Sequence, residues 1–292
     1  MAVELQTYKS ETKPDWCPGC GDFAVLSALT KALQLLEIPP WQVLIVSGIG
    51  CSSNLPGFLS AYGFHGIHGR AVPVATGAKL ANPELTVIAA GGDGDGYGIG
   101  AGHFVHAMRR NLDITYVVMN NEIYGLTTGQ ASPTSEREHK TKSTPEGVIE
   151  NPLNPIALAL ASGATFVARG FSGDVKTLTD VSVRAIRHKG FSLVDVMSPC
   201  VTYNKVNTYD WFRQRVYVVD KEGHDPKDRA AAWARASEWP NLDQKRDRVP
   251  TGVIYEADYP TYEDLEPAYR HGVPAKQKLG IADPEAVLRQ FF

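Results

Sequence analysis

Asp93 lies within a run of alternating glycines, which occupy positions 92, 94, 96, 98 and 100. Glycine lets the backbone approach a ligand closely, and a helix that begins at such a run directs free N–H groups at a phosphate. A carboxylate beside a diphosphate is repulsive unless a cation lies between them. Mg²⁺ prefers oxygen ligands in an octahedral shell that it shares with substrate phosphates, so Asp93, the side-chain oxygen of Asn121 and a nearby backbone carbonyl would suit it. The glycine run therefore predicts a diphosphate site bridged by Mg²⁺.

The four cysteines are the second set of residues with ligand chemistry: Cys17, Cys20, Cys51 and Cys200. In a reducing compartment, cysteines are ligands or nucleophiles more often than disulfides. Structural zinc sites with four cysteines usually consist of two close pairs, whereas here only Cys17 and Cys20 form a pair. A 4Fe–4S cluster tolerates scattered ligands because each thiolate binds a separate iron corner. The cysteines alone leave a cluster, zinc or unligated thiols open.

Two apolar runs, residues 85–90 and 114–119, predict the buried strands that lead into the diphosphate site. Residues 99–110 between them predict a crossover helix, so the two strands should be parallel and should end at the same edge of the sheet. Asp93 and Asn121 follow these two carboxyl ends. The sequence therefore predicts that both side chains face one ligand.

Further predicted strands place the isolated cysteines at the same edge. Cys51 follows a strand at residues 41–46, and Cys200 follows one at residues 192–196. The polar stretch 126–154 is longer than an ordinary connection, which is typical of a functional or mobile loop. The other expected segments are helices at residues 23–36, 72–81, 155–162 and 175–189, a strand at residues 165–168 and a loop at residues 54–70. This pattern indicates an α/β fold with a mostly parallel sheet flanked by helices.

The motifs are confined to residues 1–200, which we expect to form one cofactor-binding domain. From residue 201 onward the periodicity weakens. Residues 201–292 are therefore expected to form a C-terminal extension that packs on this domain or on a partner subunit.

Charge and hydropathy exclude some classes of partner. The net charge of −3 gives no reason to expect nucleic acid, and no apolar run approaches the length of a membrane span. The first residues, MAVELQTYKSETKPDW, lack the basic and apolar regions of a signal peptide. A cytoplasmic location is the default expectation.

A Rossmann loop is the main competing interpretation of the glycine run, because Gly96, Gly98 and Ala101 satisfy the looser form of that fingerprint. These glycines do not directly follow the predicted strand, and the next strand ends in asparagine where a Rossmann fold places an acid for the ribose. A glycine loop that only packs tightly leaves Asp93 and the paired asparagines unexplained. The diphosphate interpretation explains all of them.

The arrangement of Gly92-Asp93-Gly94 and Asn120-Asn121, separated by residues 95–119, resembles the diphosphate-binding signature of thiamine-diphosphate enzymes. The whole chain also resembles the β subunit of the 2-oxoacid:ferredoxin oxidoreductases. The motifs that carry this resemblance occur in the family's order over residues 16–200: CPGCG, GIGCSS, HGRAVPVATGAK, GGDGD, NNEIYGLTTGQ and SPC. Several separate motifs in register are more specific than any one of them.

The resemblance implies a thiamine-diphosphate-binding fold with a defined set of ligands. Asp93, Asn121 and the main-chain oxygen of Ile123 would hold Mg²⁺, and the four cysteines would hold one 4Fe–4S cluster near the cofactor. The residues that would bind thiamine diphosphate are Ile49, Ser52, His68, Gly92, Asp93, Gly94, Asp95, Asn121, Gly125, Leu126 and Thr127. Asp95 would accept hydrogen bonds near the metal without being a ligand.

The activity that the resemblance implies is oxidative decarboxylation of a 2-oxoacid. The cofactor adds to the keto carbon, CO₂ leaves, coenzyme A takes the acyl group, and the cluster passes electrons to ferredoxin. The form of HGRAVPVATGAK favours 2-oxoglutarate, which yields succinyl-CoA, over pyruvate.

The resemblance also implies a partner. A larger α subunit, expected in an α₂β₂ assembly, would supply the glutamate that activates the cofactor, so this chain alone should be inactive. Two alternatives stay open: a non-oxidative thiamine-diphosphate decarboxylase or synthase with a zinc or empty cysteine site, and a non-catalytic nucleotide-binding module with structural zinc.

His68 and Arg70 are the candidate catalytic residues outside the glycine loops. His68 could contact the diphosphate or move a proton, and Arg70 could clamp a substrate carboxylate through two parallel hydrogen bonds. The competing interpretation is structural: His65 and His68 would then bond loop carbonyls, and Arg70 would form an ion pair.

Overall fold

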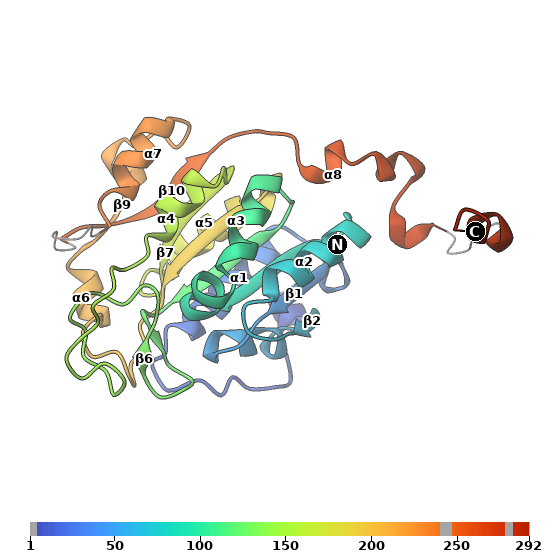
Figure 1. The fold of residues 1–292 in the computed structure, drawn as a ribbon. Coiled ribbons are helices and arrows are strands. Elements are labelled where there is room, and N and C mark those ends of the chain that lie inside the picture. The colour runs from blue at the N-terminus through green and yellow to red at the C-terminus, as the bar shows by residue number, and fades with distance from the viewer. Residues whose placement is uncertain (1–4, 240–246, 278–282, 292) are drawn as a thin grey trace.

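The structure is a computed structural model that describes residues 5–239, 247–277 and 283–291 (Figure 1). Within these residues, one sheet has the strand order β2-β1-β3-β4-β8-β7-β10-β9. The strands are β1 (Val43–Ser47), β2 (Tyr62–His65), β3 (Thr86–Gly92), β4 (Thr115–Asn120), β7 (Phe166–Phe171), β8 (Ser192–Met197), β9 (Val216–Val218) and β10 (Val249–Glu256). All neighbours are parallel except β7 and β10, which are antiparallel. The expected mostly parallel sheet is confirmed.

Helices cover both faces of this sheet (Figure 1). On one face, the apolar sides of α1 (Asp22–Leu35) and α5 (Val175–Arg187) pack in one core with every second residue of the strands, such as Val117. The intervening strand residues, such as Val118, form the opposite core with another set of helices. That set is α2 (Ala71–Ala81), α3 (Ala101–Arg110), α4 (Pro155–Ala161) and α7 (Arg229–Ala236). Strands buried on both faces read as continuous apolar runs, which is why the sequence revealed them.

Three strands of this sheet, β2, β9 and β10, differ from the sequence-based expectation. Residues 54–70 were expected to form a loop, but they contain β2, whose four residues are all exposed and therefore lack an apolar pattern. Strands β9 and β10 lie beyond residue 200, where no strand was expected, and seven of the eight residues of β10 are buried. Pro250 and Gly252 interrupt the apolar run of β10, and both residue types are unfavourable inside a strand. Pairing with β7 and β9 nevertheless stabilises the strand.

The chain around the predicted diphosphate loop is more ordered than expected. The glycine run forms a π-helical segment, Gly94–Ile99, that leads into α3. After β4, a short antiparallel hairpin consists of β5 (Ile123–Tyr124) and β6 (Gln130–Ala131). The π-helical segment and the hairpin occupy the same edge of the sheet, because β3 and β4 are parallel neighbours.

The segment after β10 crosses one end of α2 and then leads away from the sheet (Figure 1). Tyr269 donates a hydrogen bond to the carbonyl of Leu80 (2.5 Å), and Lys276 pairs with Glu84 at 2.7 Å. The remaining helices are α6 (Tyr209–Arg213), α8 (Tyr262–Leu265) and α9 (Pro284–Leu288). Across the described ranges, no helix combines the length and the apolar character that a membrane crossing requires.

Candidate functional site

One pocket lies at the carboxyl ends of β1, β3 and β4, which are adjacent in the sheet. Parallel strands that end together bring their following loops to one place, which explains why residues distant in sequence meet here. The pocket contains every residue expected to bind thiamine diphosphate, together with Ile123. Its lining is Ile49, Gly50, Cys51, Ser52, His68, Gly92, Asp93, Gly94, Asp95, Asn121, Ile123, Tyr124, Gly125, Leu126 and Thr127. We call it the cofactor pocket.

Asp93 is the buried carboxylate of the cofactor pocket, with 1% of its surface exposed. Its Oδ2 atom accepts hydrogen bonds from Ser132 Oγ at 2.5 Å and Thr134 Oγ1 at 2.6 Å. Burial raises the pKa of Asp93 to about 6, although these hydroxyls oppose the shift. A bound cation would favour the ionised form and offset this cost.

The other predicted magnesium ligands, Asn121 and Ile123, line the same pocket as Asp93, and each carries an oxygen atom that can bind a cation. The Oδ1 atom of Asn121 accepts the backbone N–H of Ile123 at 3.0 Å, so a local turn holds both residues at the pocket. Oxygen ligands from a carboxylate, an amide and a main-chain carbonyl are the set that a hard cation prefers. These residues therefore fit Mg²⁺.

Asp95 connects its own loop to the loop that contains Ile49 and to the loop that contains His68 and Gly69. Its carboxylate accepts the backbone N–H groups of Gly69 (2.7 Å) and Ile49 (3.0 Å), and Nδ1 of His68 lies 3.1 Å from Oδ1. Burial raises the pKa of Asp95, while the two N–H groups and His68 lower it. A Cβ atom added at Gly48 would lie 2.1 Å from Asp95 Oδ2, so this carboxylate requires glycine there.

The two candidate catalytic residues lie in different places. His68 lines the cofactor pocket, with its ring 6.2 Å from that of Tyr124. Arg70 does not line this pocket, and its Nη1 atom donates to the carbonyl of Gly69 at 3.2 Å. His65 faces the carbonyl of Ser53 at 2.8 Å. The structure thus brings His68, but not Arg70, to the predicted cofactor residues.

A second cavity of about 240 Å³ is lined by all four cysteines. Its lining is Asp15, Trp16, Cys17, Cys20, Cys51, Asn54, Asn121, Gly125, Leu126, Cys200, Val201, Thr202 and Tyr203. Four of these residues, Cys51, Asn121, Gly125 and Leu126, also line the cofactor pocket. We call this cavity the cysteine pocket, and it shares a wall with the cofactor pocket.

Gly125 marks the shared wall. A Cβ atom added there would lie 3.5 Å from Cys200 Sγ, 3.9 Å from Cys51 Sγ and 3.8 Å from Asn121 Nδ2. Gly125 therefore lies between two of the cysteines and the predicted magnesium ligand Asn121.

Hydrogen bonds between distant segments bring the cysteines together. Trp16 Nε1 donates to the carbonyl of Cys51 at 2.7 Å, which ties the turn before Cys17 to the loop after β1. Ser198 donates to Asp22 at 2.7 Å, which ties the start of α1 to the end of β8. These contacts depend on the tertiary fold and not on local sequence.

The cysteine pocket offers four thiol ligands from three separate segments of the chain. Among the residues that the structure describes, no three His, Cys, Asp or Glu side chains are arranged to hold one metal ion. A tetrahedral zinc ion needs four ligands that converge on one point, whereas the four ligands of a 4Fe–4S cluster each bind a separate iron atom. Burial, together with Asp22 and Cys200, raises the pKa of Cys51 to about 11, so a bound cation would favour the thiolate form.

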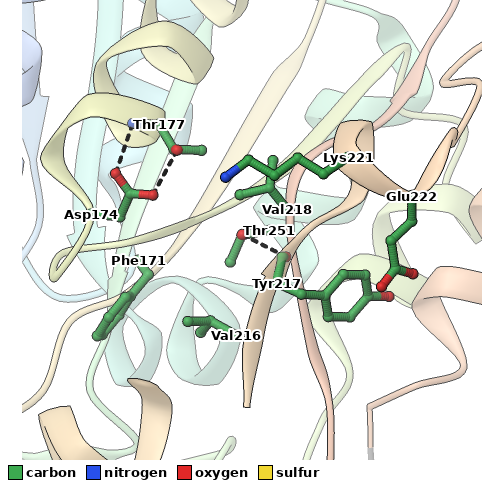
Figure 2. Close-up of a pocket in the computed structure, with 9 residues that line it drawn as sticks. All are labelled: Phe171, Asp174, Thr177, Val216, Tyr217, Val218, Lys221, Glu222 and Thr251. Carbon is green, nitrogen blue, oxygen red and sulfur yellow. Dashed lines mark hydrogen bonds between the residues drawn. The ribbon is translucent and has the colours of Figure 1, made fainter. Parts of the chain in front are cut away.

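A separate cavity of about 320 Å³ lies between α5, β9 and β10 (Figure 2). Several of its polar groups already bond within the chain: Asp174 accepts from the backbone N–H and the hydroxyl of Thr177, and Thr251 donates to the carbonyl of Tyr217. Because these groups are satisfied, this cavity is a weaker candidate than the cofactor pocket.

Sequence reasoning missed Ser132, Thr134 and Tyr124. The two hydroxyls lie in a polar stretch rich in Ser and Thr, where nothing local distinguishes the residues that contact Asp93. Tyr124 packs against the glycine loop and donates to the carbonyl of Gly94 at 3.2 Å. Its position directly after Ile123 was the only available signal.

Comparison with known proteins agrees with this geometry. Residues 48–196 match the family model described as thiamine pyrophosphate enzyme, C-terminal TPP binding domain. Residues 200–271 match the family model for the C terminal of the pyruvate ferredoxin oxidoreductase beta subunit. The chain is 48% identical to subunit beta of 2-oxoacid:ferredoxin oxidoreductase 1 from Aeropyrum pernix, over 86% of this chain and 80% of that relative.

Two further similarities concern proteins named for 2-oxoglutarate. The chain is 43% identical to 2-oxoglutarate synthase subunit KorB from Methanocaldococcus jannaschii, over 64% of this chain and 70% of that relative. A solved structure of 2-oxoglutarate:ferredoxin oxidoreductase from Magnetococcus marinus has 2-oxoglutarate, coenzyme A and succinyl-CoA bound. It matches with a TM-score of 0.89 and 40% identity, over 98% of this chain and 96% of that chain.

Proposed function

The chain belongs to the β subunits of the 2-oxoacid:ferredoxin oxidoreductases, and we propose that it holds thiamine diphosphate, Mg²⁺ and one 4Fe–4S cluster for the oxidative decarboxylation of 2-oxoglutarate. The products are succinyl-CoA and CO₂, and the electrons pass to ferredoxin. One observation carries the proposal: a pocket with oxygen ligands for Mg²⁺ shares its wall with a pocket lined by four cysteines. A non-oxidative enzyme has no need for this proximity.

In this proposal, the cofactor pocket binds the diphosphate through Mg²⁺. Asp93 and Asn121 supply side-chain oxygens, and Ile123 supplies a main-chain oxygen. A Cβ atom at Gly92 would lie 3.2 Å from Ser52 Oγ, so glycine there leaves room for the Ser52 hydroxyl at the pocket. When bound, thiamine diphosphate supplies the carbanion chemistry that decarboxylation requires.

His68 is the residue that can move a proton in this pocket. Nδ1 of His68 lies 3.1 Å from Asp95 Oδ1, so the ring lies between this carboxylate and the pocket that it lines. An imidazole ring can accept a proton on one nitrogen and donate one from the other, which is the role that we assign to His68. The role of Arg70 in binding the substrate carboxylate stays a prediction, because its side chain does not line the pocket.

The cysteine pocket would place the cluster beside the reacting cofactor. Cys17, Cys20, Cys51 and Cys200 are its ligands in this proposal. A cluster accepts one electron at a time, so it suits an oxidation whose final acceptor is ferredoxin. As a β subunit, the chain requires an α partner, and we assign the two subunits to an α₂β₂ assembly. The division of the chain near residue 200 stays a prediction.

The choice of substrate rests on the relatives. The KorB protein and the Magnetococcus marinus structure are named for 2-oxoglutarate. The family model over residues 200–271 is named for pyruvate ferredoxin oxidoreductase, which makes pyruvate the second candidate. The Aeropyrum pernix relative carries the general name 2-oxoacid:ferredoxin oxidoreductase, which does not separate the two substrates.

The test uses the assembled α/β complex under anaerobic conditions. Electron paramagnetic resonance of the dithionite-reduced complex should show a reduced 4Fe–4S signal. With coenzyme A and ferredoxin, kcat/KM should be higher for 2-oxoglutarate than for pyruvate, and succinyl-CoA should form. A complex that retains its metal but shows no cluster signal would support the non-oxidative alternative. A higher kcat/KM for pyruvate would overturn the choice of substrate and leave the reaction class intact.

A further inference from the structure

Two hydroxyl groups from a distant loop bind the carboxylate of Asp93. Ser132 Oγ and Thr134 Oγ1 both contact the same oxygen, Oδ2, at 2.5 and 2.6 Å. Both residues are buried, with 7% and 0% of their surfaces exposed. Hydroxyl donors to a buried carboxylate are charge-assisted hydrogen bonds, which are roughly twice as strong as neutral ones. Oδ2 is therefore held firmly, which defines the plane of the Asp93 carboxylate.

The β5–β6 hairpin contains a predicted metal ligand and leads directly into the loop that carries both hydroxyls. Ile123 in β5 pairs with Ala131 in β6, and Ser132 is the next residue after Ala131. The backbone N–H of Ser132 donates to Ser135 Oγ at 2.9 Å, and Ser135 Oγ donates to the carbonyl of Glu122 at 2.6 Å. Closing the hairpin thus brings Ser132 to Asp93 and Ile123 to the cofactor pocket together.

A buried polar network supports Thr134 from behind. Thr134 Oγ1 lies 2.9 Å from Asn120 Oδ1, and Asn120 Nδ2 donates to Asp195 Oδ1 at 3.1 Å. Arg169 Nε donates to the other oxygen of Asp195 at 3.1 Å. Because the Asp195 carboxylate can only accept, it fixes the orientation of the Asn120 amide. The one hydroxyl proton of Thr134 then has two acceptors, of which the Asp93 carboxylate is the stronger.

We infer that Ser132 and Thr134 are positioning residues for the metal ligand Asp93. They hold its carboxylate in the orientation that binds Mg²⁺, so the β5–β6 hairpin and the loop after it assemble the metal site. The inference rests on the proposed function, because it concerns how this chain prepares its magnesium site. Neither residue takes part in the chemical step.

The experiment measures Mg²⁺ binding instead of turnover. In the α/β complex, freed of divalent cations by a chelator, Mg²⁺ is titrated calorimetrically at saturating thiamine diphosphate. Ser132→Ala and Thr134→Val should each weaken Mg²⁺ affinity by about 10- to 100-fold, the usual effect of removing a group that orients a metal ligand. Thr134→Ser retains the hydroxyl and should restore most of the affinity.

Matched controls come from the same loop. Thr141 and Ser143 contact each other (3.2 Å between their hydroxyl oxygens) and not Asp93, so Thr141→Val and Ser143→Ala make the same chemical changes elsewhere. Both should bind Mg²⁺ as tightly as wild type. The iron content of the cysteine pocket reports whether each variant folds and assembles.

The outcomes separate this inference from the proposed function. If wild-type complex binds no Mg²⁺ with thiamine diphosphate, the proposed function is wrong. If wild type binds Mg²⁺ and Ser132→Ala binds it as tightly as Ser143→Ala, the positioning role is wrong. Should Thr134→Val fail to assemble because of its contact with Asn120, the result for Ser132→Ala decides.

Discussion

Gly94 sits against the ring of Tyr124, and alanine at this position should disturb the cofactor pocket. A Cβ atom at Gly94 would lie 2.2 Å from Tyr124 Cε1 and 2.7 Å from Cδ1 and Cζ. Carbon atoms in contact need about 3.5–4.0 Å, so the ring must move by more than about 1 Å. Tyr124 lines the cofactor pocket, and its hydroxyl bonds the carbonyl of Gly94 itself. Displacing the Tyr124 ring would therefore change the shape of the cofactor pocket.

Overpacking of this kind costs about 1–3 kcal/mol. If the whole cost appears in binding, thiamine-diphosphate affinity of the α/β complex should fall by about fivefold to 150-fold. Isothermal titration at fixed Mg²⁺ concentration measures this change. Gly102→Ala is the matched control, because a Cβ atom at Gly102 in α3 meets nothing within 4 Å. That variant should bind normally and gain up to about 1 kcal/mol of stability from better helix propensity.

The ring can be removed to test the cause. In a double-mutant cycle with Tyr124→Ala, adding Gly94→Ala should cost much less affinity than it does in wild type, because the clash is gone. Equal costs in both backgrounds would refute the steric reasoning. Normal binding by Gly94→Ala alone would refute it as well.

Three further predictions concern charge and ligands. Burial raises the pKa of Asp93 to about 6, so without metal its contribution to stability is unfavourable above pH 6 and disappears as the pH falls toward 4. This cost is about 3 kcal/mol. Thermal unfolding of the metal-free complex should therefore depend less on pH between about 4 and 6 in Asp93→Asn than in wild type, and Mg²⁺ affinity should decrease below pH 6. Parallel pH profiles would contradict this. Cys200→Ser should lose cluster iron and the reduced-cluster signal, whereas full iron content would remove Cys200 from the ligand set. Asp195→Asn removes the carboxylate that accepts from buried Arg169, and it should lower the free energy of unfolding by about 3–5 kcal/mol in chemical denaturation; a loss below 1 kcal/mol would mean that the pair contributes little.

Most of the central sheet could be predicted because its strands are buried on both faces. The apolar runs of β3, β4 and β8 are continuous, so periodicity and length located them. Their parallel direction followed from the crossover helix α3. Strand β2 could not be found in this way, because its side chains are exposed and its position depends on pairing with β1.

The sequence alone determined which residues could form the site and at which edge of the sheet they would lie. Strand ends in a parallel sheet share one edge, so Asp93, Asn121 and the cysteines after β1 and β8 could be assigned to it from local pattern. Only the tertiary structure decided how they meet. The hydroxyl groups of Ser132 and Thr134, in the loop after β6, donate hydrogen bonds to Asp93. Arg70 does not line the pocket that His68 lines. The physical reason is that a strand follows from local periodicity, whereas the direction of a loop side chain depends on hydrogen bonds and packing between segments far apart in the chain.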